Sequence, residues 1–262
     1  MMKKRSFVKP LSYVERFYRD SADSRSMVSV MVKVKDTDLH ILADRDVSKK
    51  AQELALQYRL QIEDYIRCVP RFEHSLTPLS PDPLAPPIVK AMLKAGEKTG
   101  TGPMAAVAGS IAEFVGTSLL KSYCSEIIVE NGGDLFVKKD REATVAIFAG
   151  ESPLSMRVGV RIGATKMPTG ICTSSGTVGH SLSFGRADSV TVIARSTPLA
   201  DGAATRLGNE VGRERDVDAG IKRALDASRL IDGLSGIIVV CGDKLGAVGD
   251  VELVRLGSGS NT

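Results

Sequence analysis

The stretch DSVTVIARSTPLADGAAT (residues 188–205) joins an apolar, β-branched run to a segment of small residues with helical spacing. Asp201 and Thr205 stand at positions i and i+4, so on a helix their oxygens share one face. A carboxylate and a hydroxyl are oxygen ligands that Mg²⁺ accepts, usually together with water and phosphate oxygens. The alternative is structural, with Asp201 interacting with the helix macrodipole and the small residues allowing close packing. These residues alone favour the structural interpretation.

Length and composition predict a single domain over residues 1–262. Hydrophobic residues make up 43% of the chain, which is enough for a sizeable core that needs no disulfide bonds or structural metal ions. The cysteines are far apart and form no CxxC pair; they are Cys68, Cys124, Cys172 and Cys241. Such spacing favours reduced thiols in a cytoplasmic protein.

The charge pattern argues against nucleic acid as a partner. The net charge of +4 is spread through the chain, and five Tyr and seven Phe without Trp provide no interleaved stacking surface. No apolar run approaches a membrane span by eye, and no long apolar segment follows Lys3-Lys4-Arg5. We therefore expect a cytoplasmic protein that binds neither nucleic acid nor membrane.

The first half of the chain alternates short strands with helices. Periodicity and turn residues predict an edge strand within residues 7–20, a hairpin from 27–34 and 39–43, a helix ending at Cys68, and helices over 88–95 and 104–116. The segment from Pro70 to Pro87 contains six prolines and is predicted to be a stiff, ordered crossing.

Two segments of the second half combine glycine with polar side chains. Asn131-Gly132-Gly133-Asp134 lies between apolar runs and predicts a type I′ hairpin, whose backbone N–H groups could also meet an anion. The segment from Thr169 to His180 is rich in hydroxyls and glycines, which suits either a phosphate-binding loop or a plain turn. Other strands are predicted over 144–148, 156–162, 188–194 and 236–241, the last pairing with closing strands at 244–248 and 251–255.

Four segments in this order resemble the ApbE family: 109–112, 131–134, 173–176 with His180, and 189–192 leading to 200–205. The resemblance covers roughly residues 104 to 210. It implies an α+β fold of antiparallel β-sheets with helices packed on their outer faces. It also implies binding of FAD and Mg²⁺, because the family contains FAD-binding proteins and magnesium-dependent transferases that move FMN from FAD onto a threonine of a partner protein.

The resemblance assigns roles to individual residues. Asp201 and Thr205 match the metal-binding aspartate and threonine, with a backbone carbonyl near the 104–116 helix as a third ligand. His180 matches the family histidine, a candidate general base. The residues implied to bind the flavin nucleotide are Asn131, Gly132, Gly133, Asp134, Thr173, Ser174, Ser175 and Gly176.

The sequence also departs from the transferases of that family. Glu113 stands where they have a lysine, and the Asp-Pro of their histidine-rich segment is missing after His180. Three functions remain open: a metal-dependent FMN transferase with a protein acceptor, a non-catalytic carrier of a flavin or another nucleotide, and a structural protein that keeps only the fold. The oligomeric state is left open, a homodimer included.

Overall fold

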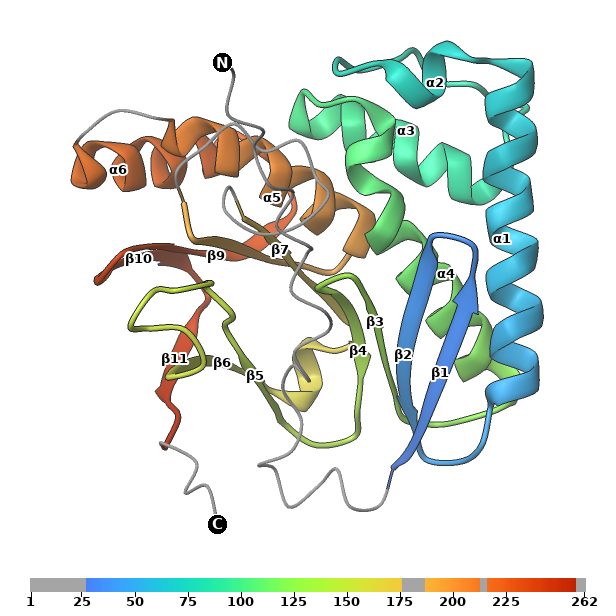
Figure 1. Ribbon diagram of the computed structural model, residues 1–262, viewed down its shortest axis with the longest axis horizontal. Helices are drawn as coiled ribbons and strands as arrows, with labels where there is room; N and C mark the ends of the chain where they lie inside the picture. Colours follow the sequence, from blue (N-terminus) through green and yellow to red (C-terminus); the bar gives the residue numbers. More distant parts are fainter. Residues whose placement is uncertain (1–26, 176–186, 213–215, 258–262) are drawn as a thin grey trace, which may run out of the picture.

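The computed structural model describes residues 27–175, 187–212 and 216–257 (Figure 1). The strand expected within residues 7–20 lies outside the described residues, as do His180 and Gly176. All structural statements below concern the described ranges.

A large antiparallel sheet forms the centre of the molecule (Figure 1). Its order is β1-β2-β3-β4-β7-β8-β9-β10. The strands are β1 (Val28–Val34), β2 (Thr37–Ala43), β3 (Ile127–Asn131), β4 (Asp134–Lys138), β7 (Thr169–Ser174), β8 (Ser189–Ala194), β9 (Leu234–Cys241) and β10 (Lys244–Gly249). The hairpins predicted around residues 27–43 and 131–134 are confirmed as β1–β2 and β3–β4.

Two strand predictions were wrong. The segment from Thr169 was interpreted as a loop, yet Thr169–Ser174 is a central strand between β4 and β8. These strands pair with its backbone, while α5 and the core between the two sheets bury its faces, which its own polar residues do not predict. The segment expected to pair with β9, β11 (Glu252–Arg255), instead pairs with β6 (Val158–Ile162). Together with β5 (Ala143–Ala146) these two strands form a separate sheet in the order β11-β6-β5.

The helices cover one face of the large sheet, and the small sheet covers the other (Figure 1). The helices are α1 (Ser48–Cys68), α2 (Arg71–His74), α3 (Pro87–Thr99), α4 (Val107–Ser122), α5 (Thr197–Val211) and α6 (Val217–Ser228), with 3₁₀ turns η2 (Pro103–Ala106) and η3 (Ala164–Lys166). Apolar residues between the two sheets form one core cluster, which includes Val145, Val160 and Ile238. The α+β class with antiparallel sheets and outer helices is therefore confirmed.

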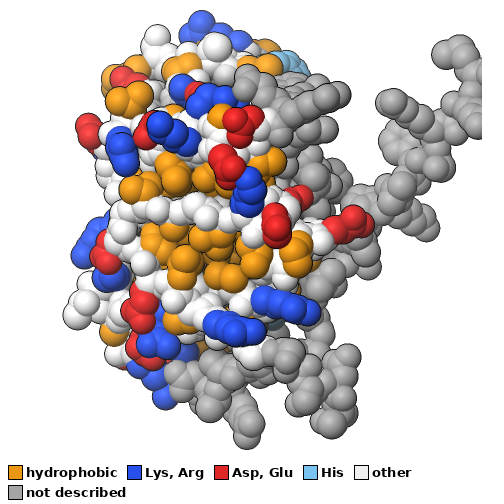
Figure 2. Space-filling view, turned by 90° about the vertical axis from the view of Figure 1, so that its left-hand side faces the viewer, with side chains coloured by type: hydrophobic (Ala, Val, Ile, Leu, Met, Phe, Trp, Pro, Cys, Tyr) orange, Lys and Arg blue, Asp and Glu red, His pale blue; other side chains and the backbone are white. Residues whose placement is uncertain are grey.

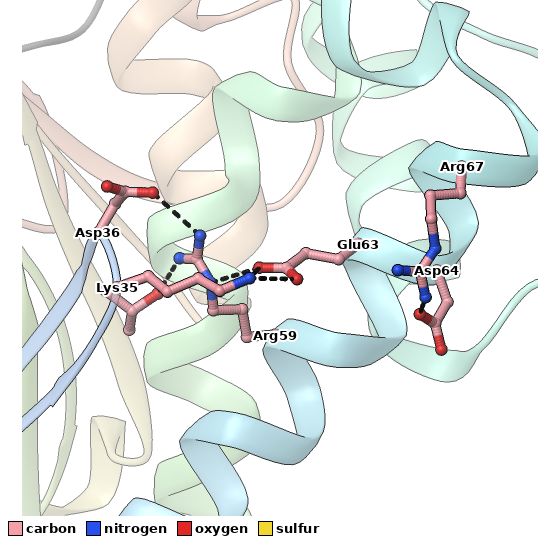
Figure 3. Close-up of polar contacts among 7 residues, drawn as sticks. Lys35, Asp36, Arg59, Glu63, Asp64 and Arg67 are labelled. Carbon is pink, nitrogen blue, oxygen red and sulfur yellow. Dashed lines mark hydrogen bonds and ion pairs between the residues drawn. The ribbon is translucent and has the colours of Figure 1, made fainter.

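A polar network anchors the β1–β2 hairpin to α1 (Figure 3). The turn at Lys35, with a φ of 53°, brings Lys35 and Asp36 towards the helix. Arg59 donates to Asp36 and to the Thr37 hydroxyl, each at 3.0 Å, and to Glu63 at 2.6 Å. Lys35 also donates to Glu63, so one arginine and one lysine hold the edge hairpin on the helix layer.

The apolar stretch that contains α4 packs closely on the sheet. A Cβ on Gly116 would lie 2.3 Å from Cδ1 of Phe136, so only glycine permits this approach. Within the described residues, Pro103–Ser122 is also the one helical stretch long and apolar enough to span a membrane, with half of its apolar window buried inside the protein. Inspection of the sequence had not anticipated such a stretch, because its apolar character comes from small residues.

Candidate functional site

Segments distant in sequence meet where α4 and α5 begin. The Nδ2 group of Asn131, at the end of β3, donates to the Ala108 carbonyl of α4 at 3.1 Å. The Thr173 N–H of β7 donates to the Asp134 carboxylate at 3.3 Å. The Gly109 N–H of α4 donates to Asp201 of α5 at 2.8 Å. These contacts join the β3–β4 turn, the end of β7 and both helix N-termini into one site.

Asp201 is the central acid of this site. It lies in the second turn of α5 and is only partly exposed, and its carboxylate also interacts with the Ala108 N–H. Burial raises its pKa well above the usual range, the nearby charge of Asp134 raises it further, and the two N–H groups of α4 oppose this shift. Thr205 is partly exposed and lies one turn later on the same helix.

Glu113 and Asp201 cap each other's helices. Oε2 of Glu113, on α4, accepts the N–H of Thr197 at 2.5 Å, and Thr197 is the first residue of α5. Asp201, on α5, accepts N–H groups from the first turn of α4. Each carboxylate therefore stabilises the unpaired donors at the start of the other helix. This exchange fixes how the two helices meet and gives Glu113 a structural role.

Glycines make the close approach of α4, α5 and β7 possible. A Cβ on Gly109 would lie 2.7 Å from the Thr197 carbonyl oxygen and 2.9 Å from Cβ of Asp201. A Cβ on Gly170, in β7, would lie 2.5 Å from Cα of Thr197. The position of Asp201 relative to the sheet thus depends on both positions having no side chain.

The β3–β4 turn is the predicted type I′ hairpin. Gly132 has a φ of 66° and Gly133 a φ of 116°, which are left-handed values that glycine adopts without strain. Among the described residues, a Cβ on Gly132 would meet no atom within 4 Å. Asp134 follows the turn with only 8% of its surface exposed. Asp134 lies close enough to Asp201 for its charge to raise the pKa of that carboxyl.

A row of hydroxyl groups borders the acids on β7 and β8. The hydroxyls of Thr173 and Thr191 lie 3.0 Å apart, and those of Ser189 and Thr191 lie 3.3 Å apart. The Ser174 hydroxyl is buried without a hydrogen-bond partner among the described residues. A buried orphan hydroxyl is costly, and a bound polar group would satisfy it.

The structure brings together most of the residues singled out from the sequence. Asn131, Asp134, Thr173 and Asp201 lie in one site through the contacts above, and Ser174 and Ser175 continue β7 at its end. His180 and Gly176 lie outside the described residues. Among those described, no group of three or more His, Cys, Asp or Glu side chains could hold a metal ion, so the expected site would also require hydroxyl or carbonyl oxygens.

Cys172 and Thr191 belong to the site but were not predicted from the sequence. The Cys172 Sγ lies 3.5 Å from the Thr197 carbonyl, and burial, with the charges of Asp134 and Asp201, raises its pKa well above the usual value. It is therefore a protonated, inert thiol. Alternation along β7 and β8 would have revealed Thr191, since it pairs with Thr173, if residues 169–174 had been interpreted as a strand.

A family model described as "AbpE bacteria" matches residues 19–241. The UPF0280 protein of Methanocaldococcus jannaschii is 42% identical over 227 residues, covering 85% of this chain and 91% of the relative. A UPF0280 protein of Methanococcus aeolicus is 40% identical over 229 residues, covering 86% of this chain and 91% of that protein.

Two solved structures share the fold. The flavin transferase ApbE from Vibrio cholerae superposes with a TM-score of 0.54 at 15% identity, covering 85% of this chain and 96% of that one. The apo form of the Pseudomonas stutzeri flavinyl transferase ApbE gives a TM-score of 0.53 at 16% identity, with 85% and 94% covered. At these identities the likeness establishes the fold alone.

Proposed function

Because the chain belongs to the "AbpE bacteria" family, as a divergent ApbE-like member, we propose that it binds FAD or a related nucleotide together with Mg²⁺. The proposed site is the cluster around Asp134 and Asp201. The observation that carries the proposal is the neighbouring pair of poorly solvated carboxylates, which raises the pKa of Asp201. A divalent cation would neutralise this repulsion.

The donor set suits Mg²⁺. Carboxylate, hydroxyl and carbonyl oxygens are its usual ligands, and the ion retains water and phosphate oxygens in its coordination shell. Asp201 and Thr205 would hold the ion, with a backbone carbonyl near the start of α4 as a third ligand. A carboxylate has about four lone-pair positions, so Asp201 can accept the N–H groups of α4 and bind a cation at the same time. The bound ion would neutralise charge on a nucleotide diphosphate.

The flavin nucleotide would lie along the β3–β4 turn and the end of β7. The buried Ser174 hydroxyl, which has no hydrogen-bond partner among the described residues, supports this position. The shared fold with two flavin transferases supports a flavin over other nucleotides. Asn131, Gly133, Thr173, Ser175 and Gly176 complete the proposed binding segments.

FMN transfer to a hydroxyl of a protein acceptor is the catalytic form of this proposal. The acceptor oxygen would attack the FMN phosphorus, the pyrophosphate bond would break, and AMP would leave. His180 would take the acceptor proton. The chain's own contribution would be to orient the nucleotide and bind the proton.

Thermal unfolding tests the binding proposal. FAD with MgCl₂ should raise the melting temperature, because a ligand at about a hundred times its Kd adds roughly 2.7 kcal/mol to the unfolding free energy. Asp201→Asn keeps an oxygen acceptor for Gly109 and removes the charge, so it should fold and lose the shift. An unchanged melting temperature in the wild type would refute the proposal.

A non-catalytic carrier is the second candidate, and Glu113 favours it. This position carries a lysine in the transferases that the chain resembles, whereas here the carboxylate is committed to the start of α5. AMP release from FAD in the presence of hydroxyl-bearing acceptor peptides distinguishes the two. A transferase releases AMP in step with peptide flavinylation, while a carrier binds FAD and leaves it intact.

We further propose that the chain acts as one domain in the cytoplasm. The core clusters on both faces of the large sheet support a single cooperative unit. Calorimetric unfolding in one transition and recovery of the protein in the soluble cell fraction are the expected results.

A further inference from the structure

Strand β10 is an edge of the large sheet without a neighbouring strand on its outer side among the described residues. Its hairpin with β9 closes at the pair Cys241–Lys244 around a two-residue turn, in which Gly242 has a φ of 60°. In such a hairpin the closing pair is hydrogen-bonded, and from there every second residue of the strand directs its N–H and C=O groups towards the partner strand. The residues between them direct these groups away from it. The N–H and C=O groups of Leu245 and Ala247 therefore face outward, whereas Gly249 has a φ of 91° and its carbonyl accepts the Val251 N–H at 3.0 Å.

The outer edge lacks the features that usually prevent strand pairing. Proteins protect edges with charged residues, prolines or bulges. Between Lys244, which begins β10, and Gly249, whose φ of 91° ends it, residues 245–248 have the sequence Leu-Gly-Ala-Val, with no charge and no proline. The opposite edge strand, β1, carries Lys33 within the strand. The β10 edge is thus open to another strand.

The sequence of β10 is complementary to itself in an antiparallel arrangement. A twofold axis through Ala247 pairs this residue with its own copy and sets Leu245 beside Gly249 of the second copy, so the outward N–H and C=O groups at the centre of the strand find partners. The same register sets Lys244 opposite Asp250. Their side chains are 46% and 67% exposed, and their present partners, Asp218 and Lys166, are also on the surface.

Apolar surface accompanies this edge. Figure 2 shows hydrophobic side chains gathered across the middle of this end of the molecule, at the level of β10, with charged side chains around them. A groove between α6 and β10 is lined by three apolar residues and bordered by charges of both signs; its residues are Ile221, Leu225, Leu245, Lys222, Arg229, Lys244, Asp218 and Asp226. On β11, Leu253 is 40% exposed. An apolar centre with a charged rim is typical of a protein interface.

We propose that a second copy of this chain pairs with the β10 edge, joining two large sheets across a twofold axis at Ala247. This proposal does not depend on the proposed flavin function. The occupant is a second copy because this register sets the exposed Lys244 of each chain opposite the exposed Asp250 of the other. An unrelated strand would not have to carry these two charges.

Charge substitution at Ala247 tests the arrangement. Ala247 is exposed, and its position opposite itself predicts that Ala247→Lys and Ala247→Glu each bring like charges together in a homodimer. Sedimentation equilibrium should give twice the 27.9 kDa chain mass for the wild type and the single mass for each variant. An equimolar mixture of the two variants should regain the dimer mass, because opposite charges then face each other.

Met31→Lys on β1 is the matched control, since Met31 is 59% exposed on the opposite edge strand, and this variant should remain dimeric. Circular dichroism establishes that each variant is folded. The proposal is overturned if the wild type has the mass of one chain at all concentrations. It is also overturned if Ala247→Lys and Ala247→Glu each remain dimeric. A mixture that stays monomeric overturns the register centred on Ala247.

Discussion

Asp201 combines a structural role with the proposed binding role. Its carboxylate accepts N–H groups at the start of α4, and it is also the proposed ligand of Mg²⁺. Truncation to alanine would therefore remove a helix cap and a ligand together. The structural interpretation of Asp201 needs correction, because α5 begins at Thr197 and Asp201 lies in its second turn; the helix start that it stabilises is that of α4.

Thr205 separates the two roles, because no described contact gives it a structural one. Thr205→Val preserves the side-chain shape and removes the hydroxyl. We predict an unchanged melting temperature without ligand and a smaller Mg²⁺-dependent stabilisation by FAD, measured by thermal unfolding. Equal stabilisation of the variant and the wild type would show that the hydroxyl is not a ligand.

Glu113 gives a pH dependence with a defined sign. Burial raises its pKa above the ordinary value of 4.5, so the folded state retains the proton to higher pH than the unfolded chain. Its contribution to the unfolding free energy is therefore complete below pH 4.5 and declines as the pH rises through the folded pKa. Glu113→Gln cannot ionise, so denaturant unfolding should show a shallower decline towards neutral pH. An identical pH profile would contradict the assignment.

At the residue scale the sequence predicts local turns better than contacts between residues that are far apart in the chain. The Asn131–Asp134 turn was predictable, because two successive glycines meet the φ requirements of a type I′ hairpin. The partner of Glu113 was not, since Thr197 is 84 residues away and no local pattern encodes that contact. The resemblance exposed Glu113 as a departure, but only the structure gives it a role.

At the scale of elements, the α4–α5 contact determines the geometry of the site. Gly109→Ala would push α4 away from Thr197 and Asp201, and overpacking of this kind typically costs about 1–3 kcal/mol. We predict a loss of that size in the unfolding free energy, together with weaker FAD binding. Denaturant titration measures the first effect.

Gly163→Ala is the matched control, because a Cβ there meets no atom within 4 Å and its φ is −69°. The same chemical change should leave the unfolding free energy unchanged or slightly higher, since alanine restricts the unfolded chain. Equal destabilisation by both substitutions would mean that the close approach at Gly109 is unimportant.

The errors among the elements have a common cause in long-range pairing. The periodicity of α1 and the β1–β2 hairpin lies within each segment, and both were predicted. In β7 the residues Thr169, Gly170 and Thr173 do not resemble a buried strand; β4 and β8 supply their backbone partners, and α5 and the core between the sheets bury them. The pairing of β11 with β6 joins segments about ninety residues apart, which strand propensity cannot specify.

For the whole molecule, the layered fold separates the proposed dimer edge from the proposed nucleotide site. The site lies where α4 and α5 meet β4 and β7, whereas β10 contacts α6 and β9. We predict that monomeric Ala247→Lys binds FAD with Mg²⁺ as the wild type does, measured by fluorescence titration. Loss of binding in a folded monomer would mean that the second copy contributes to the site.

The most direct test of the binding site is an equilibrium titration of FAD fluorescence with the wild-type protein, with MgCl₂ and then with EDTA, repeated for Asp201→Asn. We predict saturable binding of FAD that requires Mg²⁺ and is lost in the variant. Binding that persists unchanged in EDTA and in Asp201→Asn, or no binding by the wild type, would contradict a magnesium-dependent flavin site at Asp134 and Asp201.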